Sequence, residues 1–115
     1  MKKLFIILLF IFISSIVKGQ SPCGSDELCV VQFNAGWNSA NDVEWVGKLK
    51  DCEIQYIDIA SDANAATEWE IVVVPTIIVF NGKEVKRFQA DISFAMKATK
   101  NEVQEVVDEI LMDQF

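Results

Sequence analysis

The side chains best suited to covalent chemistry in this sequence are the thiols of three cysteines, Cys23, Cys29 and Cys52. Five residues separate Cys23 from Cys29, and this spacing favours a local disulfide, with Cys52 as a buried thiol. The alternative interpretation is a redox-active pair, although active pairs are typically two residues apart, which aims one thiolate at a helix N-terminus. The structural disulfide is therefore the favoured interpretation, and nothing in the spacing indicates a metal site.

The composition excludes several other kinds of chemistry. The 115 residues include no histidine, which excludes Ser–His–Asp triads, Cys–His dyads and most zinc sites. Acidic residues outnumber basic ones by 17 to 10, and the net charge of −7 argues against a nucleic-acid partner, because few cations are present to neutralise phosphates. The carboxylates are spread over expected turns and helix faces instead of forming a catalytic pair. We predict neither a metal nor a cofactor.

The N-terminus has the pattern of a secretory signal peptide over residues 1–19. Lys2 and Lys3 precede an apolar run over residues 4–17, which is too short for the ~20 residues that span a bilayer as a helix. Cleavage after Gly19 is the preferred interpretation, and a retained membrane anchor is the alternative. We therefore expect an exported chain, periplasmic or secreted, that is not inserted in a membrane after cleavage. Its oligomeric state stays open.

The rest of the chain predicts one α/β domain. Residues 20–28 are expected to form an extended segment, and residues 29–115 a single domain. Apolar, β-rich runs predict strands over residues 28–33, 54–59, 76–80 and 84–88. Asn81-Gly82 predicts a type I′ hairpin turn between the last two strands, because that turn needs positive φ at both central residues. Alternating apolar residues within the segment 89–98 suggest that the fourth strand continues there.

Three helices are expected between and after these strands. Ser39-x-x-Asp42 opens a helix over residues 39–49, and a short Ala-rich helix runs from residue 61 or 62 to about residue 70. Thr99-x-x-Glu102 is a capping box. The helix that it opens presents an apolar face toward the core, formed by Val103, Val106, Val107, Ile110 and Leu111. The resulting order β-α-β-α-β-β-α predicts a mixed four-stranded sheet with helices on both faces.

Four stretches of the sequence resemble the thioredoxin family. They are Val30-Val31-Gln32-Phe33-Asn34-Ala35-Gly36-Trp37, Tyr56-Ile57-Asp58-Ile59, Glu70-Ile71-Val72-Val73-Val74-Pro75-Thr76 and Phe80-Asn81-Gly82. The resemblance covers residues 29–111 and implies the thioredoxin-like fold. It also implies a cis peptide bond before Pro75, next to Trp37 and the helix start.

The sequence departs from the family at the positions that carry its reaction. The family has Cys-x-x-Cys after the tryptophan, whereas Trp37 is followed by Asn38-Ser39-Ala40-Asn41. An amide cannot ionise to a nucleophile, so Asn38 and Asn41 exclude ordinary disulfide exchange. The usual buried acid of the preceding strand falls at Gln32. We interpret Asn38 and Asn41 as helix caps; the alternative is a helix N-terminus that offers free N–H groups to a ligand.

In the family, the backbone just before the cis-proline pairs with an extended substrate peptide, and this capacity requires no cysteine. The resemblance therefore implies a peptide-binding surface at Trp37, Asn38, Val74 and Pro75. Our first hypothesis is an exported, redox-inactive thioredoxin-like domain that binds a protein or peptide there. The alternative is an atypical thiol–disulfide oxidoreductase that uses Cys23 and Cys29. A third possibility is an interaction protein that meets its partner through its acidic surface.

Overall fold

The structure is a computed structural model that describes residues 22–23 and 28–114. The expected signal peptide, its cleavage site and most of the N-terminal extended segment lie outside the described residues. The elements, in chain order, are β1 (Leu28–Asn34), η2 (Gly36–Asn41), η3 (Glu44–Lys48), β2 (Glu53–Asp58), α2 (Ala63–Glu68), β3 (Thr76–Asn81), β4 (Glu84–Gln89) and α3 (Lys100–Asp113). Here η marks a 3-10 helix.

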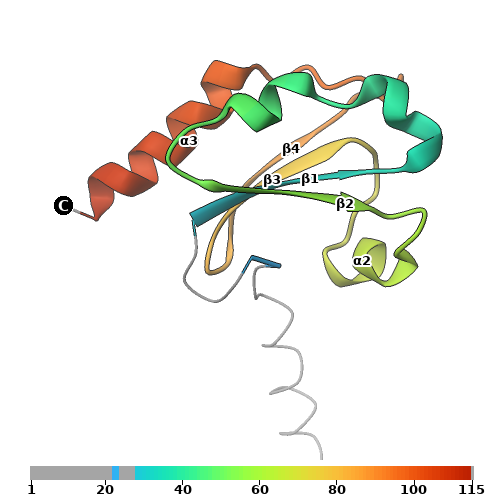
Figure 1. Ribbon diagram of the computed structural model, residues 1–115, viewed down its shortest axis with the longest axis horizontal. Helices are drawn as coiled ribbons and strands as arrows, with labels where there is room; N and C mark the ends of the chain where they lie inside the picture. Colours follow the sequence, from blue (N-terminus) through green and yellow to red (C-terminus); the bar gives the residue numbers. More distant parts are fainter. Residues whose placement is uncertain (1–21, 24–27, 115) are drawn as a thin grey trace, which may run out of the picture.

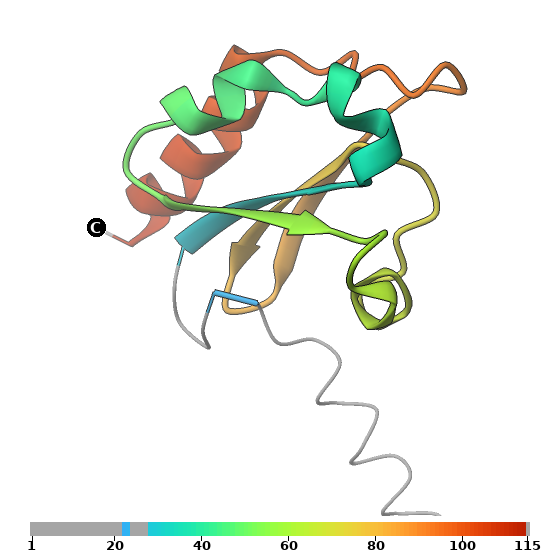
Figure 2. The same ribbon diagram turned by 45° about the vertical axis from the view of Figure 1, so that its right-hand side comes forward.

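The strands form one mixed sheet in the order β2-β1-β3-β4 (Figures 1 and 2). β1 runs parallel to β2 and antiparallel to β3, and β3 runs antiparallel to β4. Helix α3 and the two 3-10 helices cover one face, and α2 lies on the other (Figure 1). The predicted fold class, a mixed four-stranded sheet with helices on both faces, is confirmed.

The central strands β1 and β3 are buried on both faces, because each face carries its own hydrophobic cluster. On the side of α2, Val31 and Phe33 of β1 pack with Ile78 of β3 and with Trp69. On the other side, side chains of β1 and β3 pack against α3 and η3: Val30, Val46, Ile77, Val79, Val103 and Val107. Two buried faces explain why these strands are nearly continuous apolar runs in the sequence.

Helix α3 follows its prediction closely. The Thr99 hydroxyl accepts a hydrogen bond from the Glu102 N–H at 3.2 Å, and the Glu102 carboxylate accepts from the Thr99 N–H. This reciprocal capping box satisfies two donors that a helix start otherwise leaves open. The predicted apolar face packs against the sheet, with Val103 and Val107 completely buried.

The helix predicted over residues 39–49 is wrong: two short 3-10 helices, η2 and η3, take its place. Asp42 has extended geometry, with φ −55° and ψ 140°, and it separates the two. The physical reason is tertiary, because β1 binds the chain at this point. The Gln32 side chain accepts the Val43 N–H at 2.7 Å, and the Asn34 side chain donates to the Asp42 carboxylate. These bonds replace the local ones that would continue a helix.

Two predictions around the last hairpin also need correction. The turn is not type I′, because Gly82 has positive φ (83°) whereas Asn81 does not, and the Asn81 N–H donates to Lys83 O. A register shift between Val79 and Phe80 accompanies this turn.

The fourth strand ends at Gln89 and does not extend through residues 89–98. Asp91 ends the extended conformation by accepting hydrogen bonds from the backbone and hydroxyl of Ser93. The chain then turns through Phe94, whose φ is 63°. The apolar alternation in this segment therefore belongs to a loop.

Candidate functional site

A network of side-chain amides, with Asn34 and Asn38 buried, includes the two positions where the resemblance places reactive cysteines. Asn34 and Asn38 are 6% and 5% exposed. Asn38 Nδ2 donates to Asn34 Oδ1 at 3.1 Å, and Asn38 Oδ1 accepts from Asn41 Nδ2 at 2.8 Å. Asn34 Nδ2 donates in turn to Asn38 O and to the Asp42 carboxylate. The polar groups of this network satisfy one another.

This arrangement corrects the interpretation of Asn38 and Asn41 as helix caps. Neither residue caps a helix: the residue before η2 is Ala35, and no side chain caps that helix. The Asn38 N–H is also not free for a ligand, because it donates to Ala35 O at 2.8 Å. The helix-capping signal was misleading because these amides make their hydrogen bonds to each other and to Asn34 instead of to the N–H groups of a helix start.

Gln32, at the position of the family's buried acid, belongs to the same network. It is 3% exposed, its Oε1 accepts the Val43 N–H, and its Nε2 lies 3.5 Å from the Asp42 carboxylate. A neutral amide at this place can hold two parts of the chain together but cannot accept a proton at ordinary pH. The geometry therefore assigns Gln32 a structural role.

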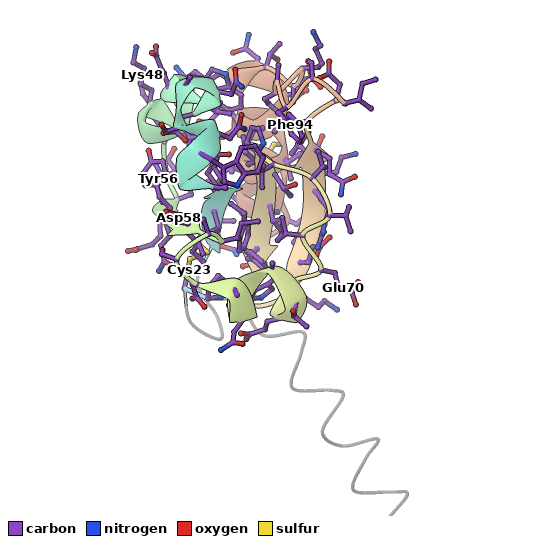
Figure 3. All side chains as sticks on the ribbon, turned by 90° about the vertical axis from the view of Figure 1, so that its right-hand side faces the viewer. Cys23, Lys48, Tyr56, Asp58, Glu70 and Phe94 are labelled. Carbon is purple, nitrogen blue, oxygen red and sulfur yellow. A yellow bond between two sulfur atoms is a disulfide. The ribbon has the colours of Figure 1, made fainter. Side chains whose placement is uncertain are left out.

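Trp37 forms an exposed aromatic pair with Phe94, a residue that the sequence analysis missed. Trp37 is 67% exposed and Phe94 40%, and their rings meet edge to face with centroids 5.4 Å apart. The Asn38 amide lies 3.5 Å from Phe94 O, so the buried network also contacts the loop that carries Phe94. Figure 3 views the molecule from this side. Because Trp37 and Phe94 are 57 residues apart, no local sequence pattern indicates that their rings are in contact.

The peptide bond between Val74 and Pro75 is cis, as the resemblance implies. Pro75 O accepts the N–H of Ala90, where the Phe94 loop begins, at 3.0 Å. Pro75 is buried and Val74 is 3% exposed. Of the four residues expected to bind a peptide, Trp37 alone has a well-exposed side chain. Asn38, Val74 and Pro75 are buried.

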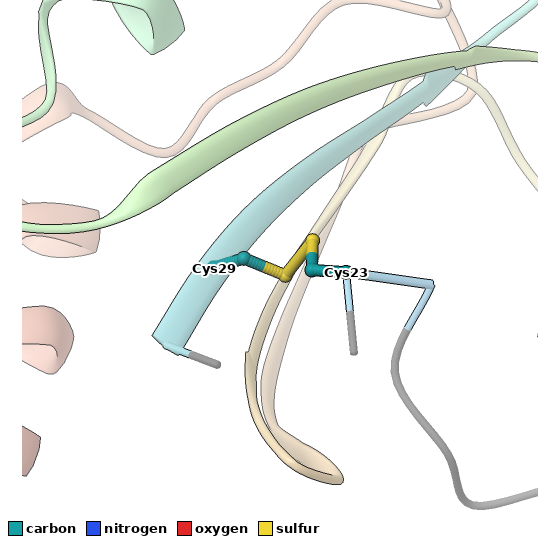
Figure 4. The surroundings of a disulfide bond; sticks show 2 residues. All are labelled: Cys23 and Cys29. Atoms are coloured by element: carbon teal, nitrogen blue, oxygen red, sulfur yellow. A yellow bond between two sulfur atoms is a disulfide. The ribbon is translucent and has the colours of Figure 1, made fainter. Parts of the chain in front are cut away.

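Cys23 and Cys29 are joined by a disulfide that ties residues 22–23 to the start of β1 (Figure 4). Cys29 is completely buried in the cluster on the α2 side of the sheet, and Cys23 packs against that cluster. An attacking thiolate needs access to one of the two sulfur atoms, so the burial of Cys29 favours a structural disulfide.

Cys52 is a free, partly buried thiol next to the cluster on the α3 side. Burial raises its pKa above the ordinary value, and the charges of Asp51 and Asp108 raise it further. A raised pKa keeps the sulfur protonated at neutral pH and makes it a poor nucleophile. This thiol is not suited to catalysis.

Within residues 22–23 and 28–114, no group of three or more cysteine, aspartate or glutamate side chains is placed to hold a metal ion. Among the same described residues, no helix is long and apolar enough to cross a membrane.

Solved thioredoxins have the same fold as this chain. The reduced thioredoxin pre-protein of Schistosoma mansoni is 22% identical, with a TM-score of 0.56 over 74% of this chain and 80% of its own. Thioredoxin 1 of Thermosipho africanus is 18% identical, with a TM-score of 0.56 over 75% and 97%. A thioredoxin variant from Halobacterium salinarum is 17% identical, with a TM-score of 0.57 over 73% and 74%.

No protein-family model matches the sequence, and neither does any curated protein. At this level of sequence identity, the similarity to these structures shows the fold alone. The chain is therefore a protein of the thioredoxin-like fold that has two asparagines where the resemblance places the reactive cysteines.

Proposed function

We propose that this chain is a redox-inactive binding domain that holds an extended segment of another protein on the surface around Trp37. The observation that carries the proposal is the exposed Trp37–Phe94 pair, whose Phe94 lies on the loop that begins where the Ala90 N–H donates to the oxygen of cis-Pro75. Aromatic side chains supply large apolar area, and an exposed pair of them at a fold's ligand-binding edge is a typical docking surface. In this proposal the chain binds a segment as the resemblance implies, without the chemistry of a dithiol.

The loss of redox chemistry is supported by the state of Asn38. Its side chain is buried and makes hydrogen bonds to Asn34 and Asn41. An amide in this position cannot form the mixed disulfide through which exchange proceeds. A partner would therefore bind and dissociate unchanged, as expected of a chaperone-like or adaptor module.

The backbone of Val74 supplies a second contact for a bound segment. Within the described part of the chain, no hydrogen bond is made to its N–H or its C=O. A peptide in extended conformation could pair with these groups as a short added strand. Because Val74 is 3% exposed, such pairing requires neighbouring side chains to move aside, and the aromatic pair provides the first contact.

We further propose that the chain is exported. The basic and apolar pattern of residues 1–19 supports this, and so does the Cys23–Cys29 disulfide, because disulfides persist in oxidising compartments.

The test is selection of peptides from a random displayed library on the purified chain, expressed from its full-length sequence. We expect bound peptides with apolar or aromatic residues, and Trp37→Ala and Phe94→Ala should each weaken their binding about tenfold or more. Val85→Ala is the matched control, because Val85 is 46% exposed on the edge strand β4. Peptide binding that is absent, or equally strong in Trp37→Ala, would contradict the proposal.

The oxidoreductase alternative is tested on the same purified chain by differential alkylation at controlled thiol–disulfide potentials. We expect the Cys23–Cys29 disulfide to stay closed through about −180 to −270 mV, the range of known exchange proteins. Opening within that range, or a mixed disulfide with another protein, would favour an enzyme.

A further inference from the structure

A cavity lies where the parallel strands β1 and β2 end, and its lining includes Gly36, the chain neighbour of Trp37. Its volume is about 290 Å³, and its walls come from β1, β2 and η2. The lining includes Asn34, Ser39, Asp42, Tyr56 and Asp58. This volume is large enough for a single side chain.

Two carboxylates face this cavity. Asp58 Oδ1 accepts the backbone N–H groups of Gly36 at 3.1 Å and of Ala60 at 2.9 Å. The second oxygen of this carboxylate makes no hydrogen bond within the described chain. Asp42 is held through one oxygen by Asn34. Among the described residues neither carboxylate forms an ion pair. Both are thus positioned by the fold and retain an oxygen for a cationic partner.

The third feature of the cavity is the ring of Tyr56, which is 59% exposed. Its hydroxyl lies against η3, where a Cβ on Gly47 would come within 3.2 Å of it. An exposed tyrosine ring beside two carboxylates is the combination that recognises a guanidinium, because arginine stacks on aromatic faces and pairs with carboxylates through a planar fork. An ammonium group matches the charge but not the planar geometry.

We propose that this cavity receives an arginine side chain of the segment that binds at Trp37. The inference rests on the proposed function and adds the partner's chemistry to it. Gly36, whose N–H holds Asp58, directly precedes Trp37. Figure 3 shows Tyr56, Asp58 and Phe94 on the same side of the molecule. An extended peptide advances about 3.3 Å per residue, so an apolar residue on the aromatic pair brings a near neighbour to the cavity.

Charge complementarity supports the choice of a basic partner. The chain carries a net charge of −7, and no lysine or arginine lines the cavity. An acidic segment would meet repulsion here, whereas a cationic side chain is attracted.

The experiment uses peptides selected on the purified chain, together with versions in which each arginine is replaced by lysine or glutamine. Binding is measured for wild type, Asp58→Asn, Trp37→Ala and Asp113→Asn. Asn keeps the oxygen that accepts from Gly36, so Asp58→Asn removes charge without removing this structural bond. Asp113→Asn is the control for charge alone, because Asp113 is exposed at the end of α3.

We expect arginine to be enriched among the selected peptides. Asp58→Asn should weaken the binding of the arginine peptides about tenfold and leave the binding of the glutamine versions unchanged. Asp113→Asn should not weaken the binding of the arginine peptides in this way. Peptides that depend on Trp37 but show no arginine preference and no effect of Asp58→Asn would overturn this inference and leave the proposed function intact. The absence of any Trp37-dependent peptide would overturn both.

Discussion

Asn34 and Asn38 are joined by two hydrogen bonds. Asn38 Nδ2 donates to Asn34 Oδ1 at 3.1 Å, and Asn34 Nδ2 donates to the backbone oxygen of Asn38 at 3.2 Å. The end of β1 is thereby attached to η2, the element that carries Trp37. Because this connection is made by neutral amides, it holds the surface around Trp37 in place without providing a reactive group.

The first prediction concerns the stability that this pair provides. Asn38→Ala removes the partners of Asn34 Oδ1 and Asn41 Nδ2, and the former is left in a buried place. An unsatisfied buried polar group costs about 1–3 kcal/mol, so the free energy of unfolding in urea should fall by that amount. Asn64→Ala, at an exposed position of α2, is the control and should change it little. Equal stability of the two variants would contradict a structural role for Asn38.

The second prediction concerns cysteines placed at the two asparagine positions. The double variant Asn38→Cys/Asn41→Cys should fold but reduce insulin only slowly. A sulfur at position 38 would be buried, and burial disfavours the thiolate. Adding Gln32→Asp restores an acid beneath the site and is expected to increase the rate. Insulin reduction at the rate of an ordinary thioredoxin by the double variant would mean that only the thiols are missing.

The third prediction concerns Asp91, which shapes the Phe94 loop. Hydrogen bonds from Ser93 lower the pKa of Asp91 from 3.8 to about 2. A lowered pKa means that the carboxylate's contribution to stability is complete above pH 3.8 and is lost as the pH falls through about 2. NMR titration of the Asp91 carboxyl should report this value. Ser93→Ala removes the hydroxyl bond but keeps the backbone N–H bond, so it should move the pKa part of the way back toward 3.8. An unchanged pKa in that variant would exclude the Ser93 hydroxyl as the main cause.

The fourth prediction concerns the reactivity of Cys52. Because burial, Asp51 and Asp108 raise the pKa of its thiol, iodoacetamide should modify the folded chain slowly at pH 7 and faster only above the ordinary thiol range. Asp108→Asn removes one of the two charges and should shift the alkylation profile to lower pH. Rapid modification at pH 7 in the folded wild type would contradict the structural assignment of this cysteine.

Much of the fold could be predicted from the sequence because the responsible signals are local. The capping box at Thr99 needs only the residue three positions on, and the strands β1 and β3 are apolar runs that match their burial on both faces. The resemblance around Pro75 implied the cis peptide bond. The exclusion of disulfide exchange at Asn38 and Asn41 also follows from residue type alone.

The tertiary structure decided the environment of the candidate site. The segment after Trp37 forms two 3-10 helices because Gln32 and Asn34 bind Asp42 and Val43 across the fold. Phe94 meets Trp37 because Asp91 turns the chain back after β4. The Trp37–Phe94 contact joins side chains that are distant in the sequence, and the Gln32 and Asn34 side chains bind residues beyond the reach of a single helical turn. The energies of such contacts compete with local helix and strand preferences. A periodicity or a short motif carries no information about which contact prevails. The sequence alone therefore determined the fold and the absence of the two thiols. The tertiary structure determined the surface around Trp37.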